Sequence, residues 1–272
     1  CDKITAFYTA EGTNVALGDR CFKGCTGLQL VRLLGNITEW GDETFMDCTS
    51  LAKVYIGTTE VTFDRIGVRA FKNCTGLSTE AAVTVAATVK VWDTECFAGC
   101  ENLVSIALST QTSTVIGARA GMEELGDYVF AGCKRLRVFL TSGFTGLKRI
   151  GAYAFYNCDT LKTPAVPKNV TSIGEGCFMD CDSVTAISFY CGLEEYPKDC
   201  FRNCVNLNRT GGLAVALNSL KRIGDGAYAG CSKLTSSSSW HLGKYANLEE
   251  IGAGAFAGCS SLSSLSLPSC VE

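Results

Sequence analysis

Apolar positions recur along the chain in a fixed order, Phe-x-x-Cys-x-x-Leu. Ten copies follow one another, with Tyr228 in place of one Phe and Val184 in place of one Leu. Successive aromatic positions are 23 to 33 residues apart, with a mean period of 26. Self-similarity at such a period indicates a stacked array of repeats. The aromatic positions are Phe22, Phe45, Phe71, Phe97, Phe130, Phe155, Phe178, Phe201, Tyr228 and Phe256.

Two further columns describe the corner of each repeat. A glycine stands four residues before the aromatic residue in eight copies, and only Gly, Asn or Asp stands just before the cysteine in all ten. These three residue types adopt a left-handed backbone more readily than others. We therefore expect one short helical turn per repeat, for example Ala152 to Tyr156, ended by a left-handed residue.

After the leucine the pattern becomes Leu-x-x-Ile-x-Leu, as at Leu103, Ile106 and Leu108. This alternation is typical of a short strand with one buried face. Stacked coils can share a core that no single coil could form. The sequence predicts an α/β leucine-rich-repeat solenoid of ten coils, with parallel strands on the concave face and short helical turns on the convex face. We expect a single domain over residues 1–272, belonging to a longer array.

Composition narrows the classes of function. A net charge of −3 gives no basic surface for nucleic acid, and no apolar run approaches the roughly 18 residues that span a bilayer. The one histidine, His241, leaves little material for acid–base or metal chemistry. We expect no enzymatic activity, no cofactor, no metal, no nucleic-acid partner and no transmembrane segment.

The 17 cysteines follow the repeat instead of a disulfide framework. Ten occupy the repeat column, and Cys21, Cys96, Cys177 and Cys200 stand just before the Phe, where other copies carry small residues. We expect these thiols to be free and buried as small packing residues. Three cysteines outside the columns are the better candidates for exposure or bridging: Cys1, Cys191 and Cys270. The aromatic column is expected to form an internal stack.

Charged pairs occupy the second extended segment of the later coils. Glu123-Glu124 is followed by Lys148-Arg149, and Glu194-Glu195 by Lys221-Arg222 and then Glu249-Glu250. Stacking would place opposite charges on neighbouring coils. We interpret this ladder as a device that fixes coil register, with a binding surface as the alternative.

The outward positions of the strands are the expected binding surface. They are small and nearly uncharged, except for a cluster of Arg32, Lys53 and Tyr55 near the N-terminal end. In the third coil they fall at Thr79 and Ala81. Tyr and Arg are enriched among interface hot spots, so this cluster and Trp240, in a degenerate coil, are our candidate partner-binding residues. An insertion within Ser109–Gly121 is a further candidate loop.

The strings Leu147–Leu161 and Leu248–Leu262 resemble the BspA-type (Treponema pallidum-type) leucine-rich repeat, and the resemblance covers residues 14–268. It implies a secreted or cell-surface protein that binds host or extracellular-matrix proteins in adhesion. Free thiols favour the alternative, an intracellular scaffold or structural repeat protein in the cytoplasm. Because we find no polar capping repeat at either end, dimerisation through the ends is a further expectation.

Overall fold

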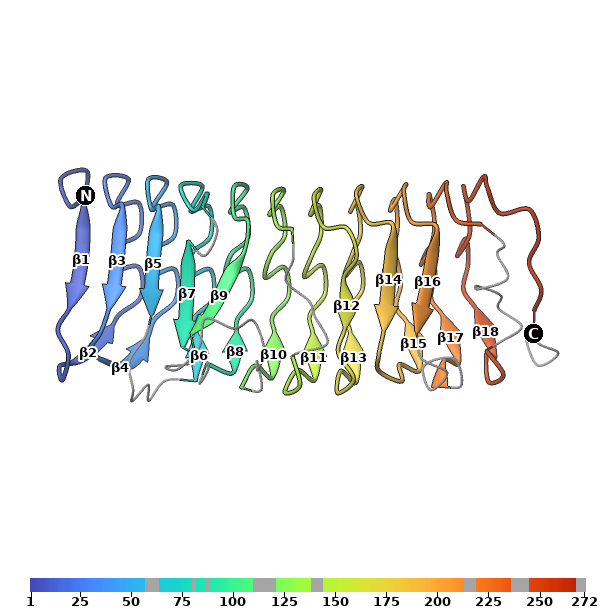
Figure 1. Ribbon diagram of the computed structural model, residues 1–272, viewed down its shortest axis with the longest axis horizontal. Coiled ribbons are helices and arrows are strands. Elements are labelled where there is room, and N and C mark those ends of the chain that lie inside the picture. The colour runs from blue at the N-terminus through green and yellow to red at the C-terminus, as the bar shows by residue number, and fades with distance from the viewer. Residues whose placement is uncertain are drawn as a thin grey trace.

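The computed structural model describes residues 1–56, 64–79, 82–86, 89–109, 121–137, 144–212, 219–235 and 245–267. Its turns lie side by side along one long axis, from the blue N-terminal end to the red C-terminal end (Figure 1). The molecule is a parallel-strand leucine-rich-repeat solenoid of about eight turns, with a period of about 24. The predicted parallel-strand solenoid is confirmed. The predicted count of ten coils with a mean period of 26 differs from these values, because it counts the ten corners, whereas eight turns carry a described strand on the main face.

The difference arises in the main strand ladders. Partners on neighbouring strands are mostly 23 or 24 residues apart, but 29 separate Val54 from Val83, so inserted loops inflated the predicted mean. Eight described turns carry a strand on this face, which we call the strand face. Its strands are β1 (Ala6–Thr9), β3 (Leu30–Leu33), β5 (Lys53–Ile56), β7 (Val83–Ala86) and β9 (Ile106–Ser109), followed by β12 (Ala165–Val166), β14 (Ala186–Phe189) and β16 (Arg209–Gly212).

The second extended segment of each coil forms further parallel sheets, which are shorter because most of its strands have only two residues. The strands are β2 (Asn14–Leu17) and β4 (Asn36–Trp40), then β6 (Arg65–Ile66), β8 (Val91–Trp92), β10 (Glu124–Leu125), β11 (Arg149–Ile150) and β13 (Ser172–Ile173), and finally β15 (Glu195–Tyr196), β17 (Arg222–Ile223) and β18 (Glu250–Ile251). One residue of each pair points into the core, as Leu125 and Ile150 do.

The corners are not helical, so the predicted helical turn is wrong. In the third corner the amides of Arg69, Phe71 and Asn73 donate to carbonyls of the next coil at 2.8–3.0 Å. The intervening amide of Lys72 donates to the Arg69 carbonyl, three residues back. This alternation leaves no ladder of bonds to the fourth preceding residue, which defines an α-helix.

Left-handed residues produce the alternation. The residue before each cysteine has a positive φ in all ten corners, as predicted; examples are Asn73 at 61° and Gly132 at 73°. A second left-handed residue stands two positions before the aromatic residue, where the sequence has Arg, Glu or Tyr in six of ten corners. Such residues cost roughly 1–2 kcal/mol in this conformation, so residue type alone did not indicate them.

The glycine four residues before the aromatic residue allows coils to approach. A Cβ on Gly174 would lie 2.2 Å from the backbone nitrogen of Ala152, in the preceding coil. Seven of the eight glycines in this column face such a collision within 2.7 Å. Gly18, in the first corner, has nothing within 4 Å. The column therefore sets how closely successive backbones can stack.

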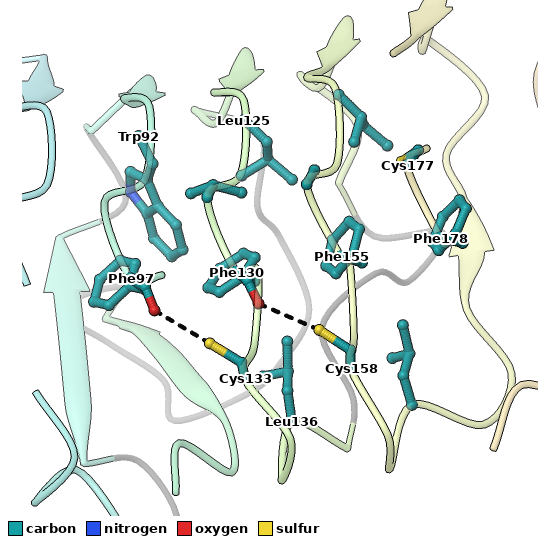
Figure 2. Close-up of a cluster of buried hydrophobic side chains, with 14 of the residues drawn as sticks. Trp92, Phe97, Leu125, Phe130, Cys133, Leu136, Phe155, Cys158, Cys177 and Phe178 are labelled. Carbon is teal, nitrogen blue, oxygen red and sulfur yellow. Dashed lines mark hydrogen bonds between the residues drawn. The ribbon is translucent and has the colours of Figure 1, made fainter. Parts of the chain in front are cut away.

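The aromatic column forms the predicted internal stack. In all nine pairs of neighbouring rings from Phe22 to Phe256, the ring centroids lie 5.0–6.1 Å apart. Figure 2 shows Phe97, Phe130, Phe155 and Phe178 in one line through the core. The stack is inaccessible along most of its length, because only the rings of Phe22 and Phe256 at its two ends are partly exposed.

The repeat cysteines form a second line beside the rings. Each thiol from Cys48 to Cys259 donates to the backbone carbonyl of the aromatic residue in the preceding coil, at 2.9–3.3 Å. Two of these bonds, Cys133 to Phe97 and Cys158 to Phe130, are visible in Figure 2. Cysteine suits this column because it combines a small apolar volume with a weak donor.

All sixteen described cysteines are free thiols. The expected burial is confirmed for the repeat column and for Cys96, Cys177 and Cys200. It is wrong for Cys21, which is exposed because no preceding corner covers it. The expected exposure is found at Cys1 but is wrong for Cys191, which is 2% exposed, and Cys270 lies outside the described residues.

Two glycine substitutions should separate backbone strain from collision. Gly132 has a positive φ but ample space, whereas Gly174 has an ordinary φ and no space for a Cβ. Gly132→Ala should lower the free energy of unfolding by about 1–2 kcal/mol. Gly174→Ala should lower it at least twice as much, because backbone must move. Thermal and urea unfolding would check this, and an equal loss in both variants would contradict the stacking argument.

The buried thiols should make the protein less stable in alkali. Burial raises the pKa of Cys100 and that of Cys181 to about 12, above the ordinary thiol value near 8.5. Unfolded thiols therefore ionise first, and stability present below about pH 8.5 is lost as the pH rises toward 12. Cys100→Ala should reduce this loss by about 1.4 kcal/mol per pH unit, measured by urea unfolding between pH 8 and 11. An unchanged pH slope would contradict the assignment.

Candidate functional site

A row of exposed side chains crosses the N-terminal end of the strand face. Strand register places Tyr8 of β1 beside Arg32 of β3, and Arg32 beside Tyr55 of β5. Thr84 of β7 continues the row. Tyr8 is 59% exposed, Arg32 is exposed and Tyr55 is partly buried. We call Tyr8, Arg32 and Tyr55 the Tyr–Arg row.

Within the row, Arg32 is held by its aromatic neighbour. Its guanidinium carbon lies 5.7 Å from the centroid of the Tyr55 ring, within cation–π range. This contact uses the ring face and leaves the guanidinium N–H groups unengaged by any described acceptor. Because the ring already orients the Arg32 side chain, a partner that binds it later causes little further loss of side-chain entropy.

Lys53 flanks the row on β5, two residues before Tyr55 and directly beside Leu30. Because side chains two residues apart share a sheet face, its exposed ammonium lies on the same surface as Arg32. The structure thus brings together Arg32, Lys53 and Tyr55, as the sequence predicted. Their role in binding stays a prediction.

Other predicted candidates fare differently. Trp240 and most of the insertion within Ser109–Gly121 lie outside the described residues. The outward position predicted at Thr79 is wrong, because β7 begins later, at Val83, and Thr84 takes that place. Sequence reasoning missed Tyr8, which precedes the first Phe-x-x-Cys-x-x-Leu copy. Tyr8 stands 24 residues before Arg32, close to one repeat period, and this spacing could have identified it as the preceding outward position.

The predicted charge ladder is confirmed on the second sheet. Arg149 donates to Glu124 at 2.6 Å, and Lys221 to Glu194 at 3.2 Å. Arg222 lies between two glutamates of neighbouring coils, 3.4 Å from Glu195 and 3.2 Å from Glu250. These charges are thus satisfied within the protein, which favours the structural interpretation of the ladder.

Several charges on the corners are also paired within the protein. Glu43 accepts from Lys23 at 2.8 Å and from Arg69 at 3.3 Å, and Arg69 also reaches Glu95. The hydrogen bond from Lys23 lowers the pKa of Glu43 below its ordinary value. Across the described residues, by contrast, Arg32 and Lys53 have no carboxylate within ion-pair distance.

Two kinds of feature are absent from the described residues. No three His, Cys, Asp or Glu side chains among the described residues lie together in a way that could hold a metal ion. In the same part of the chain, no helix has the length and apolar character needed to cross a membrane. The strand face presents a row of exposed and partly buried aromatic and cationic side chains.

Reversing one rung of the ladder should test its structural role. Lys148→Glu with Arg149→Glu would oppose Glu123 and Glu124 with like charges, and should lower the melting temperature more at 0.02 M salt than at 0.5 M because salt screens exposed charges. The matched control is Lys162→Glu with Lys168→Glu, which makes the same charge change at exposed lysines that have no described ion-pair partner. A salt dependence equal to that of the control would contradict the ladder.

We compared the chain with protein families and with known proteins. The family model described as the BspA type leucine rich repeat region, with six copies, matches residues 1–120, 110–235 and 213–272. None of the curated proteins compared with the chain matches it.

Two solved structures share the fold. A leucine-rich repeat protein from Bacteroides ovatus is 23% identical, with a TM-score of 0.70 over 94% of this chain. The chain spans 65% of the length of that protein. The Treponema pallidum leucine-rich repeat protein is 24% identical, with a TM-score of 0.52. The match covers 65% of this chain and 73% of the Treponema pallidum chain. With the family model matched along its whole length, the chain belongs to the BspA-type leucine-rich-repeat family.

Proposed function

We propose that the protein is a non-catalytic adhesion module that binds a protein partner, such as an extracellular-matrix protein, through the Tyr–Arg row on the strand face. Leucine-rich-repeat proteins are generally interaction modules, which supports the class of function. The observation that carries the site is Arg32, held over Tyr55 and flanked by the exposed Tyr8.

Three physical features support this surface as a hot spot. Tyr and Arg contribute more to binding than other exposed residues. Both tyrosines offer large contact area with few rotatable bonds. The strands beneath them are paired on a buried core, with Val31, Val54 and Ile56 at most 1% exposed, so the row is presented on a rigid support.

A secreted or cell-surface location follows from the same proposal. One observation favours the alternative of an intracellular scaffold: every described cysteine is a free thiol. Burial raises the pKa of thiols such as Cys74 well above their ordinary value, which protects them from oxidation in either compartment. The free thiols are therefore compatible with both locations, and the identity of the partner distinguishes between them better. Dimerisation through the ends stays a prediction. Light scattering at two protein concentrations would test it by measuring the molar mass in solution.

The site is tested by binding to immobilised extracellular-matrix glycoproteins, with serum albumin as the blank. The triple variant Tyr8→Ala, Arg32→Ala, Tyr55→Ala should weaken binding at least tenfold, about 1.4 kcal/mol. Tyr190→Ala removes a tyrosine that is 39% exposed just after β14, and should change binding less than twofold. Surface plasmon resonance would measure both, with melting temperatures to verify folding.

Two results would contradict the proposal. Binding that the triple variant leaves unchanged would exclude the Tyr–Arg row. Absence of binding to every matrix protein would exclude the adhesion role and leave the scaffold as the better hypothesis.

A further inference from the structure

We infer that the Tyr–Arg row and Lys53 bind an extended protein segment with acidic side chains two residues apart. This inference rests on the proposed function and names the chemistry of its partner. It is carried by the distribution of charge over the strand face, by the pairing of charges elsewhere and by the spacing of two cations.

The strand face is cationic in a protein whose net charge is −3. Among outward positions of the described strands there are three cations and no carboxylate. These positions, alternating with buried residues, are Ala6, Tyr8, Leu30, Arg32, Lys53, Tyr55, Thr84, Ala165, Ala186, Ser188 and Arg209. The acidic residues of the array are concentrated on the corners and the second sheet.

Many cations on the corners and on the second sheet are already paired. Lys23, Arg69 and Lys72 pair with glutamates of the corners, and Arg149, Lys221 and Arg222 with those of the second sheet. Over the described residues, Arg32, Lys53 and Arg209 have no such pair. Their charges are therefore available to a partner, and an acidic partner is the complementary one.

Arg32 is also positioned to accept a carboxylate. The Tyr55 ring orients the guanidinium, whose N–H groups form a fork that matches a carboxylate with two parallel hydrogen bonds. Tyr8 lies on the other side of Arg32 in the row. The Tyr55 ring covers one side of the guanidinium, and a less hydrated cation forms a stronger charge-assisted hydrogen bond.

The spacing of the two cations defines the segment. Arg32 and Lys53 lie on adjacent strands, offset by two residues in register. With strands about 4.8 Å apart and a two-residue rise of about 6.6 Å, their Cα atoms are separated by about 8 Å. Acidic residues at positions i and i+2 of an extended peptide are about 7 Å apart and point to the same side. An alternating acidic segment therefore reaches both cations at once.

The test uses fluorescence anisotropy with the full 272-residue chain. The probe is a labelled decapeptide of alternating Glu and Ser, and its control alternates Gln and Ser. The Glu peptide should bind at least tenfold more tightly than the Gln peptide at 0.05 M salt. Raising the salt to 0.5 M should remove most of that difference, because the contacts are exposed charges.

Matched variants locate the binding. Arg32→Gln with Lys53→Gln should weaken binding of the Glu peptide at least tenfold. Arg209→Gln should weaken it less than twofold, because Arg209 starts β16, far from β3 along the array (Figure 1). Melting temperatures of all variants should match that of the parent, since these side chains are exposed.

Three outcomes would overturn the inference. They are equal binding of the Glu and Gln peptides, equal loss in the Arg209 variant and the double variant, and tighter binding of a heparin oligosaccharide than of the Glu peptide. The last would assign the site to a sulfated polysaccharide. If the triple variant loses matrix-protein binding while the peptides are not distinguished, the adhesion role stands and only the acidic partner fails. If the Glu peptide binds and no matrix protein does, the acidic partner stands and only the adhesion role fails.

Discussion

The alternation of hydrogen bonds at each corner is the constraint on which the rest of the molecule depends. Two left-handed residues, four positions apart, turn every second amide toward the next coil. The corner thus bonds laterally, as a strand does, instead of closing on itself as a helix does. Because these bonds recur between neighbouring corners from Phe22 to Phe256, they fix one spacing for the backbone, the rings and the thiols that lie behind them.

That spacing also creates the candidate site. Residues 23 or 24 positions apart in sequence become neighbours on the strand face, so three side chains from separate coils form one row. The same stacking neutralises glutamates against lysines and arginines on the second sheet. Charge that is paired within the protein is thereby separated from the unpaired charge of the candidate site. The two kinds of charge lie in different columns of the repeat.

The columns were predictable because each carries one physical demand. A ring at every period can only be a buried stack, and a column restricted to Gly, Asn and Asp indicates a left-handed backbone. The charge ladder followed from the sign of successive pairs. The Arg32, Lys53 and Tyr55 cluster followed from strand alternation, which places every second residue outward.

The errors arose where residue type and conformation disagree. Arg69 and Tyr153 adopt left-handed conformations that only lateral hydrogen bonds compensate, so the corner was mistaken for a helical turn. Inserted residues before Val83 displaced β7 and increased the predicted mean period. Cys191 is buried although it stands outside every column. Its burial depends on the packing of neighbouring coils, which the pattern of a single repeat does not indicate. Tyr8 belongs to a coil without the motif that anchored the alignment.

Hydrogen exchange at single amides is the most direct test of this account. A single helical turn leaves its first amides without partners, so they would exchange rapidly. The corner described here pairs the amides of Arg69, Phe71 and Asn73 with the carbonyls of Thr94, Cys96 and Ala98 in the next coil. The account predicts slow exchange at all three in the native protein, measured by nuclear magnetic resonance. Rapid exchange at Phe71 in the folded protein would contradict it.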